Sequence, residues 1–197
     1  MDRQRVLILH GWQGSEPGHW QRWLDVELRA AGRHVLFPDL PECDQPCPDA
    51  WGASLHAGLA ALAALPGDGE RVVCAHSLAC VLWFREAARI APPLRVDRVA
   101  LVAPPCPGAR VAALARFYPT RADRAAVKAA AGHTRLVCAD DDPYCPGGGA
   151  HEHWAAPLAL TVDLLPGRGH INAEAGYGAW PAMRDWVLAG ARTPVAA

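Results

Sequence analysis

Short apolar runs and longer amphipathic stretches alternate along this chain. The apolar runs, each bounded by polar or turn residues, predict buried strands at 5–9, 34–37, 71–76, 96–102, 136–139 and 162–165. Between them, apolar residues at helical spacing predict helices at 17–31, 49–65, 77–90 and 177–191. Such alternation is typical of an α/β protein whose mostly parallel sheet, here of about six strands, is covered by helices on both faces. Ligands of such sheets bind at the carboxyl ends of the strands.

The stretch 71–82 places a serine, Ser77, at the corner between a buried strand and a helix. A nucleophilic serine is often held on such a turn, where the residues two before and two after must be small because the strand and helix backbones nearly touch. Ala75 and Ala79 meet this size requirement, although glycine is usual at both positions. The alternative is that Ser77 only caps the helix, since serine is a preferred N-cap residue.

Two later strands end in residues that complete a catalytic set. A serine on such a turn works with a carboxylate and then a histidine, in that chain order. The acids 140–142 follow one strand and His170 follows the next. Any of Asp140, Asp141 and Asp142 is a candidate, because adjacent carboxylates also cap helices or stay solvated.

Other histidines compete with His170 for the role of general base. They are His10, His19 and His76. His76 directly precedes the serine, and neighbouring side chains at such a corner diverge, so it is badly placed to take the hydroxyl proton. Chain order and the preceding glycine favour His170.

The first predicted strand runs into a glycine-rich loop that begins His10-Gly11-Trp12. In a site of this kind, the loop after the first core strand contributes a backbone N–H that stabilises an oxyanion, and glycine lets the loop approach the reacting carbonyl. We expect the N–H groups of Trp12 and Leu78 to form this oxyanion hole. The alternative is an ordinary glycine-rich turn.

The length and charge of the chain narrow the class of protein. With 197 residues, half of them hydrophobic, we expect one domain spanning residues 1–197. The formal net charge of −1, with acids and bases spread along the chain, predicts no nucleic acid partner and no anionic membrane partner. No apolar run has the length of a membrane span and no leader segment precedes the first strand, so we expect a soluble, cytoplasmic protein.

The cysteines predict neither disulfides nor a metal site. They are seven, an odd number, and Cys74, Cys80 and Cys138 lie in or beside predicted core elements. We therefore expect reduced thiols that act as small hydrophobic side chains. Cys43 and Cys47 lack the second ligand pair that a zinc site needs. His151-Glu152-His153 lacks the helical spacing of two metal ligands, so we expect no metal and no cofactor.

Several motifs together resemble the small serine hydrolases related to retinoblastoma-binding protein 9. The resemblance covers nearly the whole chain and rests on the early His-Gly loop with Gly18-His19-Trp20, and on the segments 37–41, 75–79, 141–144 and 169–172. It implies a three-layer α/β-hydrolase fold and a triad with Ser77 as nucleophile, Asp142 as the orienting acid and His170 as the base. Ala75 and Ala79 depart from the family pattern.

The segment 104–132 falls where hydrolases of this fold often insert a lid. It is short and predicts two short helices, so we expect a minimal lid or none. We expect its aromatic residues Phe117 and Tyr118, together with His10, to line the substrate pocket. The alternative for both aromatic residues is simple packing in the core.

These residues predict an enzyme that hydrolyses a small ester, thioester or activated amide through an acyl-serine intermediate, without a cofactor. Its partner is a small acyl substrate, and no protein partner is indicated. One alternative is a binding protein that keeps the fold and has lost turnover. Another is an acyl transferase or lyase on the same scaffold.

Overall fold

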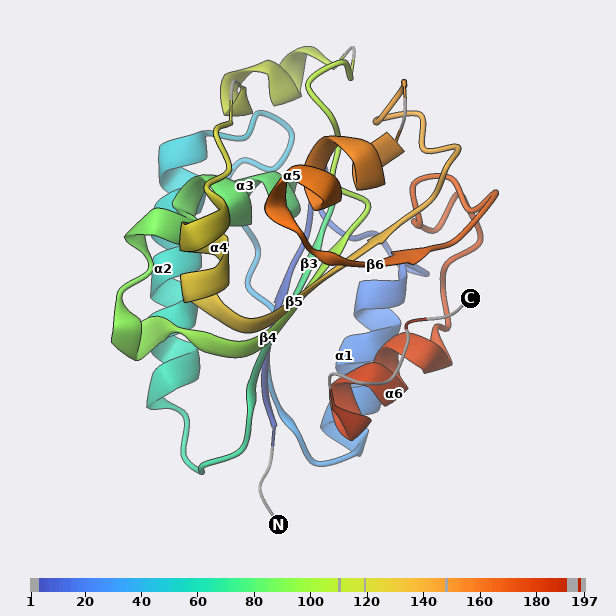
Figure 1. Cartoon of the computed structure of the whole chain (residues 1–197). Coiled ribbons are helices and arrows are strands. Elements are labelled where there is room, and N and C mark those ends of the chain that lie inside the picture. Colours follow the sequence, from blue (N-terminus) through green and yellow to red (C-terminus); the bar gives the residue numbers. More distant parts are fainter. Residues whose placement is uncertain (1–3, 110, 119, 148, 191–194, 196–197) are drawn as a thin grey trace.

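The structure is a computed structural model, and it describes residues 4–109, 111–118, 120–147, 149–190 and 195. Its centre is a six-stranded sheet in the order β2-β1-β3-β4-β5-β6, and every neighbouring pair of strands is parallel (Figure 1). The strands are β1 Arg5–Leu9, β2 His34–Leu36, β3 Arg71–His76, β4 Val96–Val102, β5 Ala131–Cys138 and β6 Thr161–Leu164. The prediction of a mostly parallel sheet of about six strands is confirmed.

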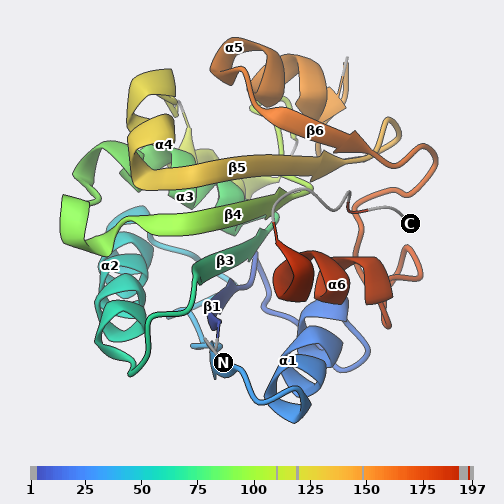
Figure 2. The ribbon, with the colours of Figure 1, turned by 60° about the horizontal axis from the view of Figure 1, so that its bottom comes forward.

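Helices cover both faces of the sheet, as Figures 1 and 2 show. On one face lie α1 Trp20–Ala30 and α6 Pro181–Ala189; on the other lie α2 Pro48–Ala64, α3 Leu78–Glu86 and α4 Arg124–Ala130. The shorter helices are η1 Ala87–Arg89, η2 Pro92–Leu94, η3 Ala112–Phe117, η4 His151–Ala155 and α5 Ala156–Leu158. Three layers therefore make up the α/β-hydrolase fold.

The central strands β1, β3 and β4 are largely apolar on both faces because both faces are covered. In β1, Leu7 and Leu9 pack into the core under α2 and α3, whereas Val6 and Ile8 pack into the core under α1 and α6. All four side chains are fully buried, and each contributes roughly 1.5–3 kcal/mol to stability. β3 pairs with β1 on one side and β4 on the other, so the residue that follows β3 lies in the middle of the carboxyl edge of the sheet.

Several element boundaries differ from those predicted, and three of them differ by four or more residues. The last helix begins at Pro181 instead of residue 177, because proline fits the first turn of a helix and disrupts its interior. Tyr177 and Trp180 precede it and are still buried. The helix after Ser77 ends at Glu86 and passes into η1, and β5 begins at Ala131 rather than at residue 136.

The cysteines were predicted correctly only in part. Cys74, Cys80 and Cys138 are buried free thiols in the core, as expected. Cys106 and Cys145 form a disulfide, so the prediction that all thiols are reduced is wrong for this pair. Spacing along the chain gave no sign of it, because the two residues are 39 positions apart and meet only through the fold.

None of the helices in the described ranges has the length and apolar character needed to cross a lipid bilayer. The same residues contain no group of three or more histidine, cysteine, aspartate or glutamate side chains arranged to hold a metal ion.

Candidate active site

Ser77 occupies a strained corner between β3 and α3. Its φ of +54° and ψ of −123° lie outside the regions that a non-glycine residue normally adopts. The corner is held by hydrogen bonds from Ser77 N–H to the Val102 carbonyl, at 2.8 Å, and from Cys80 N–H to the Ser77 carbonyl, at 2.9 Å. Ala75 and Ala79 are fully buried beside it, so alanine is small enough at both positions for this turn.

The Ser77 hydroxyl does not cap α3. Its side chain accepts no hydrogen bond from the first turn of the helix. Instead, its Oγ lies 2.8 Å from Nε2 of His170. The capping interpretation of Ser77 is therefore excluded, and the strained backbone aims the hydroxyl at a histidine.

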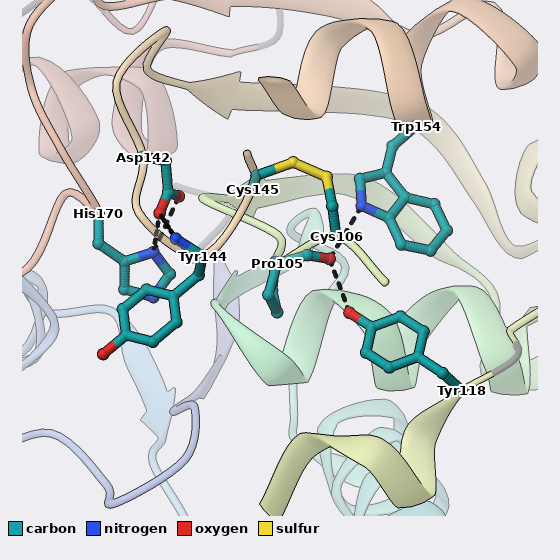
Figure 3. Close-up of a disulfide and its surroundings, with 8 residues drawn as sticks. All are labelled: Pro105, Cys106, Tyr118, Asp142, Tyr144, Cys145, Trp154 and His170. Atoms are coloured by element: carbon teal, nitrogen blue, oxygen red, sulfur yellow. Dashed lines mark hydrogen bonds and ion pairs between the residues drawn. A yellow bond between two sulfur atoms is a disulfide. The ribbon is translucent and has the colours of Figure 1, made fainter. Parts of the chain in front are cut away.

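His170 connects Ser77 to Asp142. Nδ1 of His170 lies 3.0 Å from Oδ1 and 2.9 Å from Oδ2 of Asp142, whose side chain is 1% exposed. Because a carboxylate only accepts hydrogen bonds, Nδ1 carries the proton and the lone pair of Nε2 faces the Ser77 hydroxyl. The backbone N–H of Tyr144 also donates to Asp142 Oδ1, at 2.9 Å (Figure 3). The carboxylate is thus fixed from two sides.

The two neighbouring acids hold the loop that carries His170. Asp140 Oδ1 accepts a hydrogen bond from Gly167 N–H at 2.8 Å, and Asp141 Oδ1 accepts one from Gly169 N–H at 2.7 Å. Both acids are exposed, and only Asp142 contacts the imidazole. The structure thus distinguishes three carboxylates that the sequence left as alternatives.

Two further histidines, His76 and His19, lie near His170, and neither contacts the Ser77 hydroxyl. His76 Nε2 lies 3.0 Å from the backbone carbonyl of His170 and donates to it. Burial lowers the pKa of His76 well below its ordinary value, so its ring is neutral. His19 caps α1 by accepting the Gln21 N–H, and burial lowers its pKa to about 4. Neither ring is placed to take a proton from Ser77.

The loop after β1 packs directly against Ser77. A Cβ added at Gly11 would stand 2.6 Å from Ser77 Cβ and 3.1 Å from its Oγ, so this position requires glycine. His10 fixes the same loop. Its Nε2 accepts the Leu40 N–H at 2.8 Å, which leaves Nδ1–H to donate to the Gly11 carbonyl at 2.9 Å.

This bond orients the peptide that follows Gly11. A trans peptide holds its C=O and N–H on opposite sides, so the Trp12 N–H points away from the His10 ring. Among the backbone hydrogen bonds of the described loops and caps, neither the Trp12 N–H nor the Leu78 N–H is a donor.

A cavity of about 160 Å³ opens over Ser77. Trp12, Leu114 and Tyr144 form its apolar walls, and the polar side chains Gln13, Glu16 and Asn172 also line it. The sequence pointed to neither Leu114 nor Glu16. A larger hollow of about 270 Å³ lies at the start of β5, but no serine, cysteine or carboxylate lines it.

The pocket residues predicted from the sequence lie elsewhere. Phe117 is fully buried and packs edge-on against Trp51, with ring centroids 5.6 Å apart. The Tyr118 hydroxyl donates to the Pro105 carbonyl, and His10 also packs against Trp51. None of the three lines the cavity over Ser77. Burying a large aromatic ring stabilises the core, which explains why η3 turns Phe117 inward.

Comparisons with known proteins agree with this geometry. A family model described as serine hydrolase matches residues 6–189. No curated protein matches the chain.

Solved structures resemble the chain over most of its length. The ydeN gene product of B. subtilis is 21% identical with a TM-score of 0.81, over 95% of this chain and 97% of that one. A putative YdeN-like hydrolase from Pectobacterium atrosepticum is 20% identical with a TM-score of 0.69, over 94% and 90%. Est1E from Butyrivibrio proteoclasticus, solved with ferulic acid bound, is 13% identical with a TM-score of 0.65, over 95% and 88%. At these identities the likeness shows the fold.

Proposed function

The chain belongs to the serine hydrolase family, and we propose that it cleaves a small ester, thioester or activated amide through an acyl intermediate on Ser77. The observation that carries this proposal is the 2.8 Å contact between Ser77 Oγ and His170 Nε2, made by a serine whose φ is +54°. A helix cap requires neither the strained backbone nor the histidine.

The three side chains divide the chemistry as follows. Ser77 Oγ attacks the substrate carbonyl while its proton passes to His170 Nε2. Asp142 holds the imidazole in the tautomer that accepts this proton and stabilises the imidazolium that results. His170 then protonates the leaving group, which departs and leaves the acyl group on Ser77. A water molecule, deprotonated by His170, attacks the acyl carbon. His170 returns this proton to Ser77 Oγ as the acyl–oxygen bond breaks, which releases the acid and restores the free serine.

The oxyanion that forms at each attack needs hydrogen-bond donors, and we assign the Trp12 and Leu78 N–H groups to this role. Two observations support the assignment. The Gly11 backbone lies against Ser77. The hydrogen bond from His10 to the Gly11 carbonyl orients this peptide so that the Trp12 N–H points to the opposite side. Donors fixed in this way before the reaction lower the barrier without a cost of reorganisation.

The size of the cavity supports a small acyl group. At about 160 Å³ the cavity is smaller than the roughly 300–1,000 Å³ clefts that hold drug-sized ligands, which favours a short acyl chain. Three apolar side chains, Trp12, Leu114 and Tyr144, contact such a chain, whereas the remaining wall is largely polar. Substrate parts beyond the first few carbons find little apolar surface.

Finer assignments are part of the same proposal. A closer relation to the retinoblastoma-binding protein 9 family rests on the shared motifs. The alternatives of an inactive binding protein and of an acyl transferase or lyase predict different products. Only a hydrolase releases the free acid without an added acceptor.

Labelling with a fluorophosphonate probe tests the proposal. We expect the folded protein to be labelled at Ser77 and the folded Ser77→Ala variant to stay unlabelled. Ser54→Ala is a matched control, because the Ser54 hydroxyl donates to the Ala50 carbonyl within α2, away from the site. Ser54→Ala should label at the wild-type rate. A folded wild-type protein that stays unlabelled would favour the binding protein.

A further inference from the structure

The Cys106–Cys145 disulfide lies next to the acid that orients His170 (Figure 3). Cys106 belongs to the segment that leaves β4, and Cys145 stands three positions after Asp142. Both cysteines are nearly fully buried, with 4% and 3% of their surface exposed. The cross-link therefore joins the carboxyl end of a central strand to the loop that carries Asp142.

Short main-chain bonds connect the disulfide to the Asp142 carboxylate. Cys106 N–H donates to the Tyr144 carbonyl at 2.9 Å, and Cys145 N–H donates to the Asp142 carbonyl at 3.0 Å. Tyr144 N–H in turn donates to Asp142 Oδ1. The turn formed by residues 142–145 is thus held to the β4 segment by one covalent bond and one hydrogen bond, and the same turn sets the direction of the carboxylate.

The other end of the cross-link is itself anchored. The carbonyl of Pro105 accepts hydrogen bonds from the Tyr118 hydroxyl at 2.8 Å and from Trp154 Nε1 at 3.1 Å. Figure 3 shows both donors meeting at this carbonyl, directly before Cys106. Cys106 is therefore a fixed point from which the turn of Asp142 is held.

We propose that the Cys106–Cys145 disulfide is a positioning element for Asp142, so that the activity of Ser77 depends on the redox state of this pair. The inference rests on the proposed function.

A dithiol reduces the disulfide by donating two electrons and two protons. Two cysteine thiols form, the S–S bond breaks, and the reductant becomes a cyclic disulfide. The turn is then held only by hydrogen bonds, and the carboxylate loses its alignment with His170 Nδ1.

This role differs from that of a disulfide that only stabilises the fold. In a reducing compartment, disulfides are usually transient and redox-sensing, whereas in an oxidising one they are usually structural. A structural cross-link changes the free energy of unfolding and leaves the folded enzyme fully active. A positioning cross-link changes the turnover of protein that is still folded.

The double variant Cys106→Ala/Cys145→Ala separates the two roles. We expect kcat to fall about 100-fold while the protein stays folded, the loss typical of a catalytic group displaced by about 1 Å. We expect the triple variant that also carries Asp142→Asn to be no slower than Asp142→Asn alone, because both changes act on the same hydrogen bond. Effects that instead multiply would show that the disulfide does not act through Asp142 and would overturn the proposal.

A spectroscopic readout reports the alignment directly. The Nδ1 proton of His170, shared with a carboxylate, gives a proton resonance far downfield, identified by its absence in Asp142→Asn. We expect the double variant to lose or broaden this resonance. A resonance unchanged in position and width would contradict the proposal.

Reduction of the wild-type protein completes the test. Thiol titration after denaturation should find five free cysteines before treatment with dithiothreitol and seven after it. Turnover should fall with the reduction of the pair and return on reoxidation, while dithiothreitol should leave the double variant unaffected. Cys47→Ala, which removes a free thiol on another element, should respond like the wild type.

The outcomes keep this proposal separate from the assignment of Ser77. If the oxidised wild-type protein is folded but is not labelled by a fluorophosphonate, the proposed function itself is refuted. If the wild-type protein is labelled and the folded double variant has an unchanged kcat, only the role of the disulfide is refuted. If neither the double variant nor the reduced wild type keeps the native fold, the cross-link is structural and the proposal is wrong.

Discussion

Gly11 is the residue whose substitution tests the oxyanion loop most sharply. In Gly11→Ala, the new methyl group would stand 2.6 Å from Ser77 Cβ and 3.2 Å from the His76 carbonyl oxygen. Carbon atoms in contact are normally about 3.5–4.0 Å apart, so the loop must move by about 1 Å. Because His76 ends β3 and Ser77 directly follows it, between two strands that pair with β3, the loop rather than the strand should give way.

The expected loss follows from this displacement. Moving the Trp12 N–H by about 1 Å removes most of its interaction with the oxyanion. The loss of one oxyanion donor lowers kcat about 10²–10³-fold. We therefore expect kcat for p-nitrophenyl acetate to fall by this factor, with KM changed less, because the oxyanion forms only in the transition state. Initial rates over a range of substrate concentrations give both constants.

Gly58→Ala is the matched control for this substitution. A Cβ at Gly58 would stand 3.2 Å from the end of the Leu7 side chain, so this position is also tightly packed. Leu7 lies in the core under α2. Its kcat should be within about twofold of wild type, whatever the change in stability. If Gly11→Ala stays folded and keeps its full kcat, the loop takes no part in stabilising the oxyanion and the assignment of Trp12 is refuted.

Three other predictions follow from the site. Asp142→Asn should lower kcat about 10⁴-fold and Asp141→Asn far less, because only Asp142 contacts the imidazole. Steady-state rates of folded variants will show this difference. kcat/KM for p-nitrophenyl esters from acetate to palmitate should rise over the first few carbons and then level off; a continued rise would contradict the small cavity. Burial lowers the pKa of His19 from 6.5 to about 4, so between these two pH values the unfolded chain binds more protons than the folded one. The free energy of unfolding should therefore decrease as pH falls from about 6.5 to 4, by up to about 3 kcal/mol. His19→Asn, which keeps an N-cap acceptor, should show a flatter decrease in denaturant titrations.

The sheet was predictable from the sequence because its strands are buried on both faces. Such strands contain continuous apolar runs, as in residues 72–75 of β3 and 99–102 of β4, and their order along the chain follows from alternation with helices. The position of Ser77 was predictable for the same reason, since it directly follows the run that forms β3. The end of the last helix was predicted at residue 191, which lies outside the described residues.

Features that depend on tertiary contacts were not predictable in the same way. Three adjacent aspartates follow β5, and only the folded loops decide that Asp140 and Asp141 bind backbone N–H groups while Asp142 binds His170. The inward turn of Phe117 depends on Trp51, which lies in a helix far away in the sequence. The resemblance to a known family singled out Asp142, whereas the residues alone left the choice open.

Trapping of the acyl-enzyme tests the central claim most directly. The protein is mixed with excess p-nitrophenyl acetate, quenched in acid after a short time, and digested for mass spectrometry. We predict a burst of p-nitrophenol, and one acetyl group on the peptide that contains Ser77, absent from the Ser77→Ala variant. An acetyl group found on another residue, or full turnover by Ser77→Ala, would contradict the assignment of Ser77 as the nucleophile.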